Sequence, residues 1–222
     1  MDGRGVTPFS VGDVEIGSGR LAIIAGPCMA ESYDLCLEVG TKMAELCRER
    51  GFGYIFKASF DKANRTSAAS VRGFGIEEGL DTIARVGKAL GAPTTTDVHL
   101  PEQCEIAARS TDLLQIPAFL SRQSDLLEAA ALTGKPVNVK KGQFLAPHDT
   151  KNIVEKLRDY RSNGIMLTER GASFGYNALI VDFPGLETMR GFGVPVCFDA
   201  THSAQRPGGQ GTSTGGARET IP

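Results

Sequence analysis

Short apolar runs rich in β-branched residues alternate along the chain with longer segments whose apolar residues recur at helical spacing. Because the short runs are apolar throughout, they indicate parallel strands that are buried on both faces. This alternation predicts an α/β fold with one parallel sheet. The predicted strands are Leu21–Ala25, Tyr54–Ala58, Thr94–Asp97, Leu113–Ile116, Val137–Val139, Ile165–Thr168 and Val194–Phe198, and the predicted helices include Leu35–Arg50, Glu77–Leu90, Pro101–Arg109, Ser124–Leu132 and Thr150–Tyr160.

The predicted strands follow one another without a linker or a change of composition, which favours a (β/α)8 TIM barrel. A barrel of eight units takes about 250 residues, whereas this chain has 222 and stops where a seventh helix would begin. We therefore expect the last strand and its flanking helices to be missing. The rival is a doubly wound open sheet, but the glycine-rich turn expected after its first strand is absent.

The first 20 residues are expected to form an N-terminal extension to a catalytic barrel domain at residues 21–222. Within this extension, Pro8–Ile16 alternates weakly around Gly12-Asp13. Such a pattern predicts a short β-hairpin before the first barrel strand.

Composition and charge exclude several classes of protein. Lys and Arg number 24 against 26 Asp and Glu, for a net charge of -2, so a broad basic surface for nucleic acid is not expected. No apolar stretch approaches the roughly 18 residues of a membrane span, and the N-terminus has no signal-peptide core. We therefore expect a cytoplasmic protein. The five cysteines show no CxxC spacing and are expected to be free thiols, with Cys36 and Cys47 filling the core.

Polar residues follow nearly every predicted strand, and in barrels the C-terminal strand ends build the active site. Loops are polar in any protein, but charged residues at almost every strand end predict one shared pocket. The residues, strand by strand, are Pro27 and Cys28; Lys57, Asp61, Lys62, Asn64 and Arg65; Asp97 and His99; Gln115, with Arg122 beyond it; Asn138, Lys140 and Lys141; Glu169 and Arg170; and Asp199 and His202.

Cations outnumber acids in this set, although the whole protein is slightly negative. A positive pocket suits a substrate with several phosphate or carboxylate groups. The segment KANRTS, residues 62–67, could wrap one phosphate or could simply cap a helix. The Gly/Ser/Thr-rich stretch after His202 is expected to be a lid over the pocket or a plain surface loop.

Cys28 has three interpretations that spacing alone leaves open. In a closed barrel the first and seventh strands flank the eighth, so Cys28 and His202 could approach each other. A thiolate and an imidazole suit Zn²⁺, Fe²⁺ or a similar metal better than Mg²⁺, and carboxylates would have to complete the site. Cys28 could instead be a nucleophile paired with His202, or a small core residue.

Several long motifs resemble the 3-deoxy-D-manno-octulosonate 8-phosphate synthases, also called 2-dehydro-3-deoxyphosphooctonate aldolases. The motifs are AGPCMAES, FKASFDKANRTS, TTTDVH, LLQIPAFLSRQSDLL, VNVKKGQFLAP, LTERGASFGYN and FDATHSAQRPGG. The resemblance implies a (β/α)8 barrel, assembled as a homotetramer, that is a transferase. Its reaction condenses phosphoenolpyruvate, arabinose 5-phosphate and water into the eight-carbon sugar acid phosphate and inorganic phosphate, for the lipopolysaccharide core.

A related family, the 3-deoxy-D-arabino-heptulosonate 7-phosphate synthases, uses erythrose 4-phosphate and is the alternative. Its loop typically reads Lys-Pro-Arg-Thr, whereas this chain has Lys62-Ala63-Asn64-Arg65-Thr66, as the octulosonate enzymes do. A second alternative is an inactive barrel fragment that only binds ligand or self-associates.

The resemblance also implies roles for individual residues. Cysteine at position 28 is typical of the metal-dependent members, where metal-independent members carry asparagine. It implies a divalent metal (Zn, Fe, Mn or Co) held by Cys28 and His202, with the family's other ligands expected beyond Pro222. The remaining roles are phosphoenolpyruvate binding for Lys57, Lys62, Lys140 and Arg170, with Gln115 and Pro117-Ala118 lining the pocket; aldose phosphate binding for Asn64, Arg65 and Thr66; contact with sugar hydroxyls for Asp97; a contact across a subunit interface for Arg122; and proton movement for Asp199 and His202.

Overall fold

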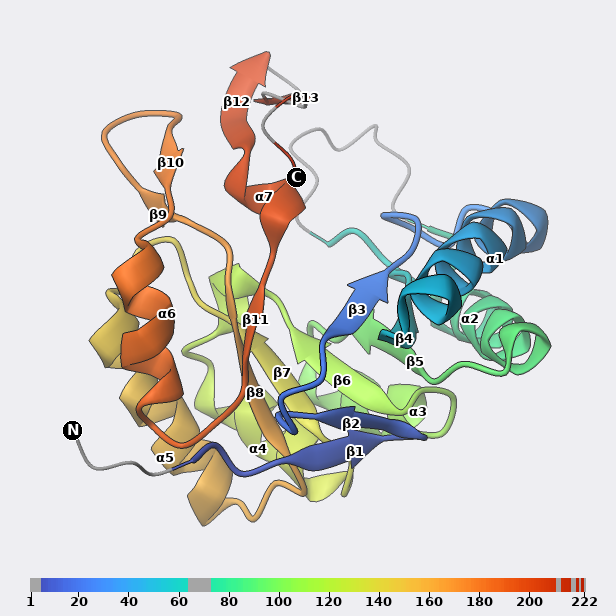
Figure 1. Ribbon diagram of the computed structural model, residues 1–222, viewed down its shortest axis with the longest axis horizontal. Coiled ribbons are helices and arrows are strands. Elements are labelled where there is room, and N and C mark those ends of the chain that lie inside the picture. The colour runs from blue at the N-terminus through green and yellow to red at the C-terminus, as the bar shows by residue number, and fades with distance from the viewer. Residues whose placement is uncertain (1–4, 64–72, 211–212, 217–218, 220, 222) are drawn as a thin grey trace.

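The computed structural model describes residues 5–63, 73–210, 213–216, 219 and 221 of the chain. At its centre lies a seven-stranded parallel sheet that curls into a half-barrel, with the order β11-β8-β7-β6-β5-β4-β3 (Figure 1). These strands are β3 (Ala22–Ala25), β4 (Gly53–Lys57), β5 (Thr94–Asp97), β6 (Leu113–Ile116), β7 (Val137–Lys140), β8 (Ile165–Glu169) and β11 (Val196–Phe198). The α/β prediction with a parallel sheet is confirmed, and each predicted strand overlaps an observed one.

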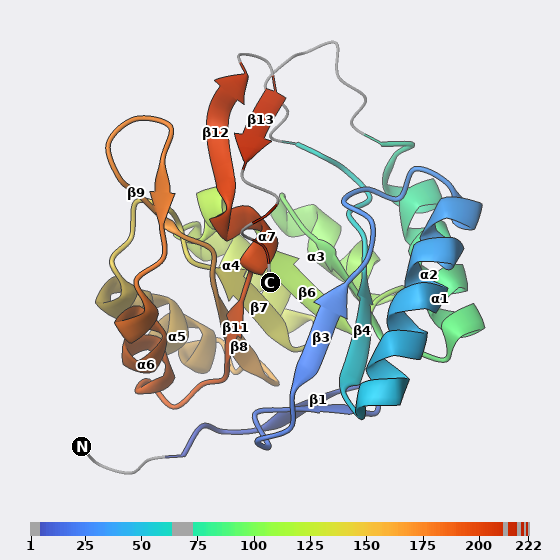
Figure 2. The ribbon, with the colours of Figure 1, turned by 45° about the horizontal axis from the view of Figure 1, so that its top comes forward.

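Helices cover the outer face of the sheet (Figure 2). They are α1 (Tyr33–Arg50), α2 (Ile76–Leu90), α3 (Pro101–Ala108), α4 (Ser124–Leu132), α5 (Lys151–Asp159) and α6 (Phe183–Arg190), with the short 3-10 helices η1 (Ala118–Leu120) and η2 (Pro147–Thr150). Ser32 caps α1 by accepting the backbone N–H of Leu35 at 3.2 Å, and Gly51 ends it in the left-handed conformation with φ 69°.

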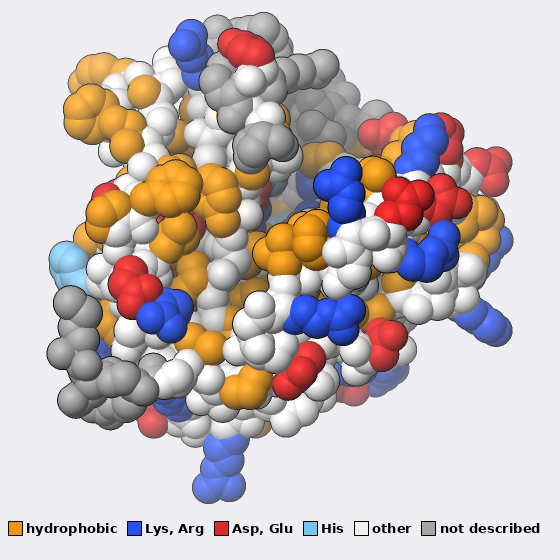
Figure 3. Space-filling view, in the orientation of Figure 1, with side chains coloured by type: hydrophobic (Ala, Val, Ile, Leu, Met, Phe, Trp, Pro, Cys, Tyr) orange, Lys and Arg blue, Asp and Glu red, His pale blue; other side chains and the backbone are white. Residues whose placement is uncertain are grey.

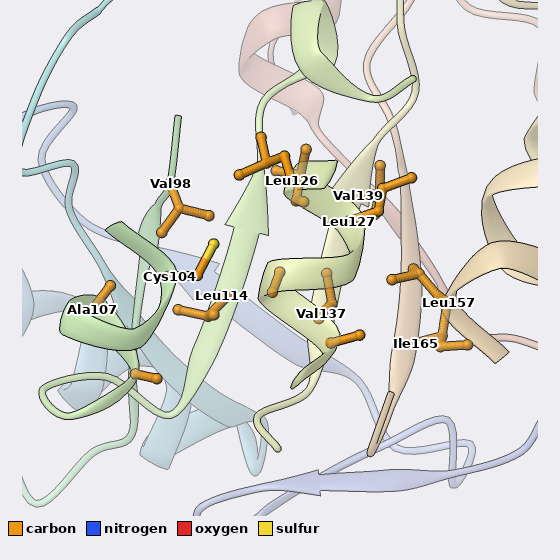
Figure 4. Packing of buried hydrophobic residues seen from close by; sticks show 14 of the residues in the cluster. Val98, Cys104, Ala107, Leu114, Leu126, Leu127, Val137, Val139, Leu157 and Ile165 are labelled. Atoms are coloured by element: carbon orange, nitrogen blue, oxygen red, sulfur yellow. The ribbon is translucent and has the colours of Figure 1, made fainter. Parts of the chain in front are cut away.

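Alternate side chains of each strand enter two separate apolar clusters, because successive side chains point to opposite faces. Leu114 and Val139 pack outward against the helices, in the same cluster as Leu127 of α4 (Figure 4). Leu113 and Met166 point to the inner face and belong to the other cluster. Both faces of the sheet are therefore buried toward the N-terminal ends of its strands, which explains the continuous apolar runs in the sequence.

The N-terminal strands β1 (Phe9–Val11) and β2 (Val14–Ile16) pair antiparallel across Gly12-Asp13. Gly12 has φ +57°, and a Cβ there would lie 2.9 Å from Pro93, so the turn requires glycine. Val11, Val14 and Ile16 are buried against the inner-face cluster of the sheet. The hairpin thus forms an apolar floor at the N-terminal ends of the strands.

Residues 172–190 contain elements that the sequence pattern did not predict. The two short strands β9 (Ala172–Ser173) and β10 (Leu179–Ile180) pair antiparallel and lead into α6. The loop between these strands exposes Phe174 and Tyr176, and apolar side chains gather there on the face seen in Figure 3. This region is an exposed apolar surface beside the strand ends.

The expectation of a loop after His202 needs correction. A short helix α7 (Ala200–Ser203) follows β11, and then β12 (Gln205–Gln210) and β13 (Ser213–Gly216) pair antiparallel, with a register shift between Arg206 and Gln210. Backbone pairing satisfies the peptide groups of this glycine-rich segment without large side chains. Among the described residues, no helix has the length and apolar character needed to cross a membrane.

Candidate active site

Polar side chains lie above the apolar floor on the inner face of the sheet. Side chains two residues apart on a strand share a face. Gln115 therefore lies on the same inner face as Leu113, and Thr168 on the same face as Met166, in each case nearer the C-terminal end of the strand. Four such residues, one from each of β5 to β8, form what we call the polar row: Asp97, Gln115, Asn138 and Thr168. All four are buried, with at most 7% of their surface exposed.

A continuous line of hydrogen bonds joins the polar row. Gln115 Nε2 donates to Asp97 Oδ1 at 2.5 Å, and Asn138 Nδ2 donates to Gln115 Oε1 at 2.9 Å. The Thr168 hydroxyl donates to Asn138 Oδ1 at 2.7 Å. At the other end, Lys57 Nζ donates to Asp97 Oδ2 at 2.9 Å. The row therefore connects five neighbouring strands, from β4 to β8.

Two lysines converge near Asp97. Ser59 Oγ accepts from Lys57 Nζ at 3.0 Å and from Lys62 Nζ at 2.9 Å, while its own hydroxyl donates to Asp97. Burial alone would raise the pKa of Asp97, but Lys57, Lys62 and the hydrogen bonds from Ser59 and Gln115 hold it well below its usual range. Asp97 is therefore a carboxylate at neutral pH. Burial, followed by repulsion from Lys57, lowers the pKa of Lys62.

A second polar cluster lies at the end of β7 and β11. Lys140 Nζ is 2.5 Å from Asp199 Oδ2, and His202 Nδ1 lies 2.7 Å from the same oxygen. Burial opposes ionisation of Asp199, but His202 and Lys140 hold its pKa well below the usual range. The hydrogen bond that His202 donates to Asp199 favours protonation of the imidazole, but burial and Lys140 outweigh it and lower the pKa of His202. His202 is therefore neutral at pH 7, with Nδ1–H directed at Asp199.

Arg170 is a buried cation, and some of its N–H groups lack an acceptor in the described part of the chain. It is 6% exposed, and its Nε and Nη1 atoms have no hydrogen-bond partner among the described residues. Glu169 Oε1 fixes the adjacent backbone by accepting the N–H groups of Arg170 at 2.9 Å and Gly171 at 2.6 Å. Desolvation lowers the pKa of Arg170, with Asp199 and Glu169 opposing the shift. A guanidinium held in this state is suited to bind an anion.

Cys28 and His202 supply donors of the kind that a borderline divalent metal prefers. Cys28 is exposed after β3 and is a hydrogen-bond partner of Lys62. Asp199 holds Nδ1 of His202, an arrangement that commonly orients a metal-binding imidazole through its other nitrogen. Across the described part of the chain, no group of three or more His, Cys, Asp or Glu side chains is placed to hold a metal. The two donors fit a metal in kind, and such a site needs further ligands.

The structure brings together many, but not all, of the predicted site residues. Lys57, Lys62, Asp97 and Gln115 share one network, and Lys140, Asp199 and His202 share another. Arg122 is exposed between η1 and α4, and its role across a subunit interface stays a prediction. Asn64, Arg65 and Thr66 lie outside the described residues.

Ser59 and Thr168 were missing from the predicted site, although both hydrogen-bond within it. Ser59 comes two residues after Lys57, and Thr168 comes two residues before Arg170. Ser59 and Arg170 lie just beyond the ends of β4 and β8, and strand alternation continued past those ends would place each pair on one face. The two-residue spacing was therefore the signal that could have found them. Their partners, however, depend on register across strands.

Comparison with known proteins supports the motifs found in the sequence. The family model described as the DAHP synthetase I family matches residues 6–219. A 2-dehydro-3-deoxyphosphooctonate aldolase of Cyanothece sp. is 55% identical over 98% of this chain and 78% of its own length. Proteins of the same name from Geobacter sp. and Rhizobium meliloti are 56% and 52% identical, over 96% and 91% of this chain and 78% and 72% of their own lengths. The chain belongs to the DAHP synthetase I family, and these relatives place it among the 2-dehydro-3-deoxyphosphooctonate aldolases.

Proposed function

We propose that this protein is a 3-deoxy-8-phosphooctulonate synthase that condenses phosphoenolpyruvate, D-arabinose 5-phosphate and water. The products are 3-deoxy-D-manno-octulosonate 8-phosphate and inorganic phosphate, for lipopolysaccharide core biosynthesis in the cytoplasm. The supporting observation is the buried Arg170 guanidinium at the strand ends, whose Nε and Nη1 have no hydrogen-bond partner in the described part of the chain. The chain is also more than half identical to aldolases of this name. A doubly anionic substrate such as phosphoenolpyruvate suits those donors.

In this proposal the cations hold phosphoenolpyruvate and stabilise charge. Arg170 and Lys140 bind its phosphate and carboxylate from one side of the pocket, and Lys57 and Lys62 bind from the other. C3 of phosphoenolpyruvate forms a bond to the aldehyde carbon of the sugar, while the C=O π pair moves to the aldehyde oxygen, which takes up a proton. Water adds at C2 and loses a proton. The C2–O bond to phosphate then breaks, and the leaving phosphate keeps the electron pair. Buried donors that are already in place stabilise this transferred charge strongly.

We also assign a divalent metal (Zn, Fe, Mn or Co) to Cys28 and His202. When bound, it would polarise the aldehyde and orient the water. Asp199 accepts the hydrogen bond of His202 Nδ1, so Nε2 is the ring nitrogen assigned to the metal. The same nitrogen cannot bind a metal and accept a proton, so transfer of the proton from water to the aldehyde oxygen is assigned to the Asp199–Lys140 pair, whose atoms lie 2.5 Å apart.

Self-association completes the proposal. We assign a homotetramer in which Arg122 reaches the aldose phosphate site of a neighbouring subunit, while Asn64, Arg65 and Thr66 bind that phosphate within each subunit. The exposed apolar side chains between β9 and β10 support association, because contiguous apolar surface commonly marks a protein interface.

Phosphate release from phosphoenolpyruvate tests the reaction. We expect release with arabinose 5-phosphate, and a much smaller kcat/KM with erythrose 4-phosphate. Arg170→Ala should lower kcat/KM by about a hundredfold, because it removes a charged hydrogen-bonding group. Arg190→Ala is the matched control, since Arg190 is exposed and pairs with Glu187 on its own helix. Preference for the four-carbon sugar would favour the heptulosonate synthase, and no release with either sugar would favour the inactive fragment.

Metal binding is tested separately from turnover. Elemental analysis of purified protein should find a divalent transition metal, and Cys28→Asn should lose most of it. A chelator should inactivate the unmodified protein more strongly than the Cys28→Asn variant. Equal metal content in both proteins, with equal sensitivity to the chelator, would contradict Cys28 as a ligand.

A further inference from the structure

We propose that Asn138 and Thr168 are positioning residues that fix the side-chain amide of Gln115 and, through it, Asp97 and Lys57. This inference rests on the proposed function, because it assigns Gln115 and Lys57 to the phosphoenolpyruvate pocket. Asn138 and Thr168 are 1% and 2% exposed. Their hydrogen bonds connect them to Gln115 and Asp97 along the polar row, from β8 to β5.

The charge on Asp97 sets the direction of every hydrogen bond in the row. An ionised carboxylate can only accept, so Gln115 must present its NH₂ group to Asp97 and its carbonyl to Asn138. Asn138 must then donate its own NH₂ and turn its carbonyl to Thr168, whose hydroxyl donates. Each amide therefore has one orientation that satisfies its neighbours.

Thr168 completes this order at the far end of the row. Cys197 on β11 is the register partner of Thr168 and is its hydrogen-bond partner. Desolvation raises the pKa of Cys197 to about 11, so its thiol is protonated and can donate to the threonine oxygen. The hydroxyl proton of Thr168 is then available to be donated to the Asn138 carbonyl oxygen. Without that proton, the Asn138 carbonyl would be buried without a donor, and the orientation of the Asn138 and Gln115 amides would lose its support.

Two substitutions at Thr168 separate its hydroxyl from its shape. Thr168→Val keeps the shape but removes the donor, and Thr168→Ser keeps the donor. We expect Thr168→Val to lower kcat/KM for phosphoenolpyruvate about fivefold to tenfold, the effect of one net hydrogen bond, and Thr168→Ser to recover most of the loss. Thr95→Val is the matched control, because the Thr95 hydroxyl is buried on strand β5 of the same sheet without a hydrogen-bond partner among the described residues. It should leave kcat/KM unchanged.

Asn138→Asp tests the positioning role through the pH dependence of activity, which a merely structural role would leave unchanged. An ionised carboxyl at this position turns an acceptor toward the Gln115 carbonyl, whereas a protonated carboxyl can donate as the amide does. Asp97 faces the new group across Gln115, and Lys57 and Lys140 are the nearby cations on the same face of the sheet. We expect the activity of Asn138→Asp, relative to unmodified protein, to rise as the pH falls.

The outcomes distinguish this inference from the proposed function. Absence of phosphate release by the unmodified protein would count against the proposed function. Calorimetric titration with phosphoenolpyruvate then provides the same comparison without turnover, with an expected fivefold weaker Kd for Thr168→Val. Equal kcat/KM and equal Kd for Thr168→Val and Thr95→Val would overturn the positioning inference. A pH profile of activity for Asn138→Asp that runs parallel to that of the unmodified protein would also overturn the inference. If Thr168→Val fails to fold, this pH profile alone tests the inference.

Discussion

The buried ion pair between Lys141 and Glu169 makes a quantitative prediction about stability. Lys141 Nζ lies 3.5 Å from Glu169 Oε1, and the two side chains are 1% and 2% exposed. At this distance the attraction is about 5 kcal/mol for an effective dielectric constant of about 20. Lys141→Met keeps the length of the side chain but leaves the carboxylate without its cation. Desolvation, which lowers the pKa of Lys141, offsets part of the attraction.

The remaining partners of Glu169 set the size of the loss. Its Oε1 still accepts the backbone N–H groups of Arg170 and Gly171 in the variant. We therefore expect Lys141→Met to lower the free energy of unfolding by about 3–4 kcal/mol, within the range for breaking a buried pair. The double variant Lys141→Met/Glu169→Gln should be more stable than Lys141→Met, since the neutral amide keeps an oxygen for both N–H groups.

Urea unfolding at pH 7, followed by circular dichroism, measures these differences. Lys42→Met is the control, because its partner Glu38 lies 2.6 Å away but both side chains are more than 60% exposed, so little change is expected. The reasoning fails if Lys141→Met costs less than about 1 kcal/mol. It also fails if the double variant loses the sum of the two single losses, since the two side chains would then not interact.

Three further predictions concern the strands around the site. The pKa of Asp97 in the folded protein lies well below its ordinary value of 3.8, so Asp97 takes up a proton on unfolding in acid. The free energy of unfolding should therefore fall as the pH drops toward and below 3.8. Urea unfolding between pH 6 and pH 3 should show a smaller decrease in this free energy for Asp97→Asn than for the unmodified protein. Gly26→Ala would place a Cβ against the Lys57 carbonyl oxygen, and we expect a loss of about 1–3 kcal/mol and a lower melting temperature by calorimetry; an unchanged melting temperature would contradict this contact. Tyr54→Phe removes the hydroxyl that donates to the Ala25 carbonyl oxygen at 3.0 Å, and should lower the free energy of unfolding in urea by about 1 kcal/mol, whereas no loss would mean that the bond contributes nothing.

The strands could be predicted from the sequence because their burial on both faces makes them apolar throughout. β5 and β6 have the predicted bounds. Helix α6 could not be predicted, because Pro184 and Gly185 in its first turn are typical of a loop. A Cβ at Gly185 would lie 2.6 Å from Pro147, so close packing against η2, rather than helix propensity, accounts for this segment.

The charged residues at the strand ends could also be predicted, but their partners could not. Lys57 and Asp97 were identified separately, and only the curl and register of the sheet bring them within 2.9 Å. The polar row likewise depends on Gln115 lying opposite Asn138, a pairing between strands that are separated by α4 in the sequence. Local pattern determines which side chains face inward, whereas register determines which of them meet.

The hairpin of β1 and β2 has a consequence for the synthesis of this protein. Val11, Val14 and Ile16 are made first, and Ile55 of the same cluster follows early, but the cluster members Leu113 and Met166 lie far later in the chain. On the ribosome, the hairpin can pack early against β3 and β4, but its burial is complete only after β8 has emerged. The part of the floor that packs against β6 and β8 would therefore be among the last parts of the half-barrel to close.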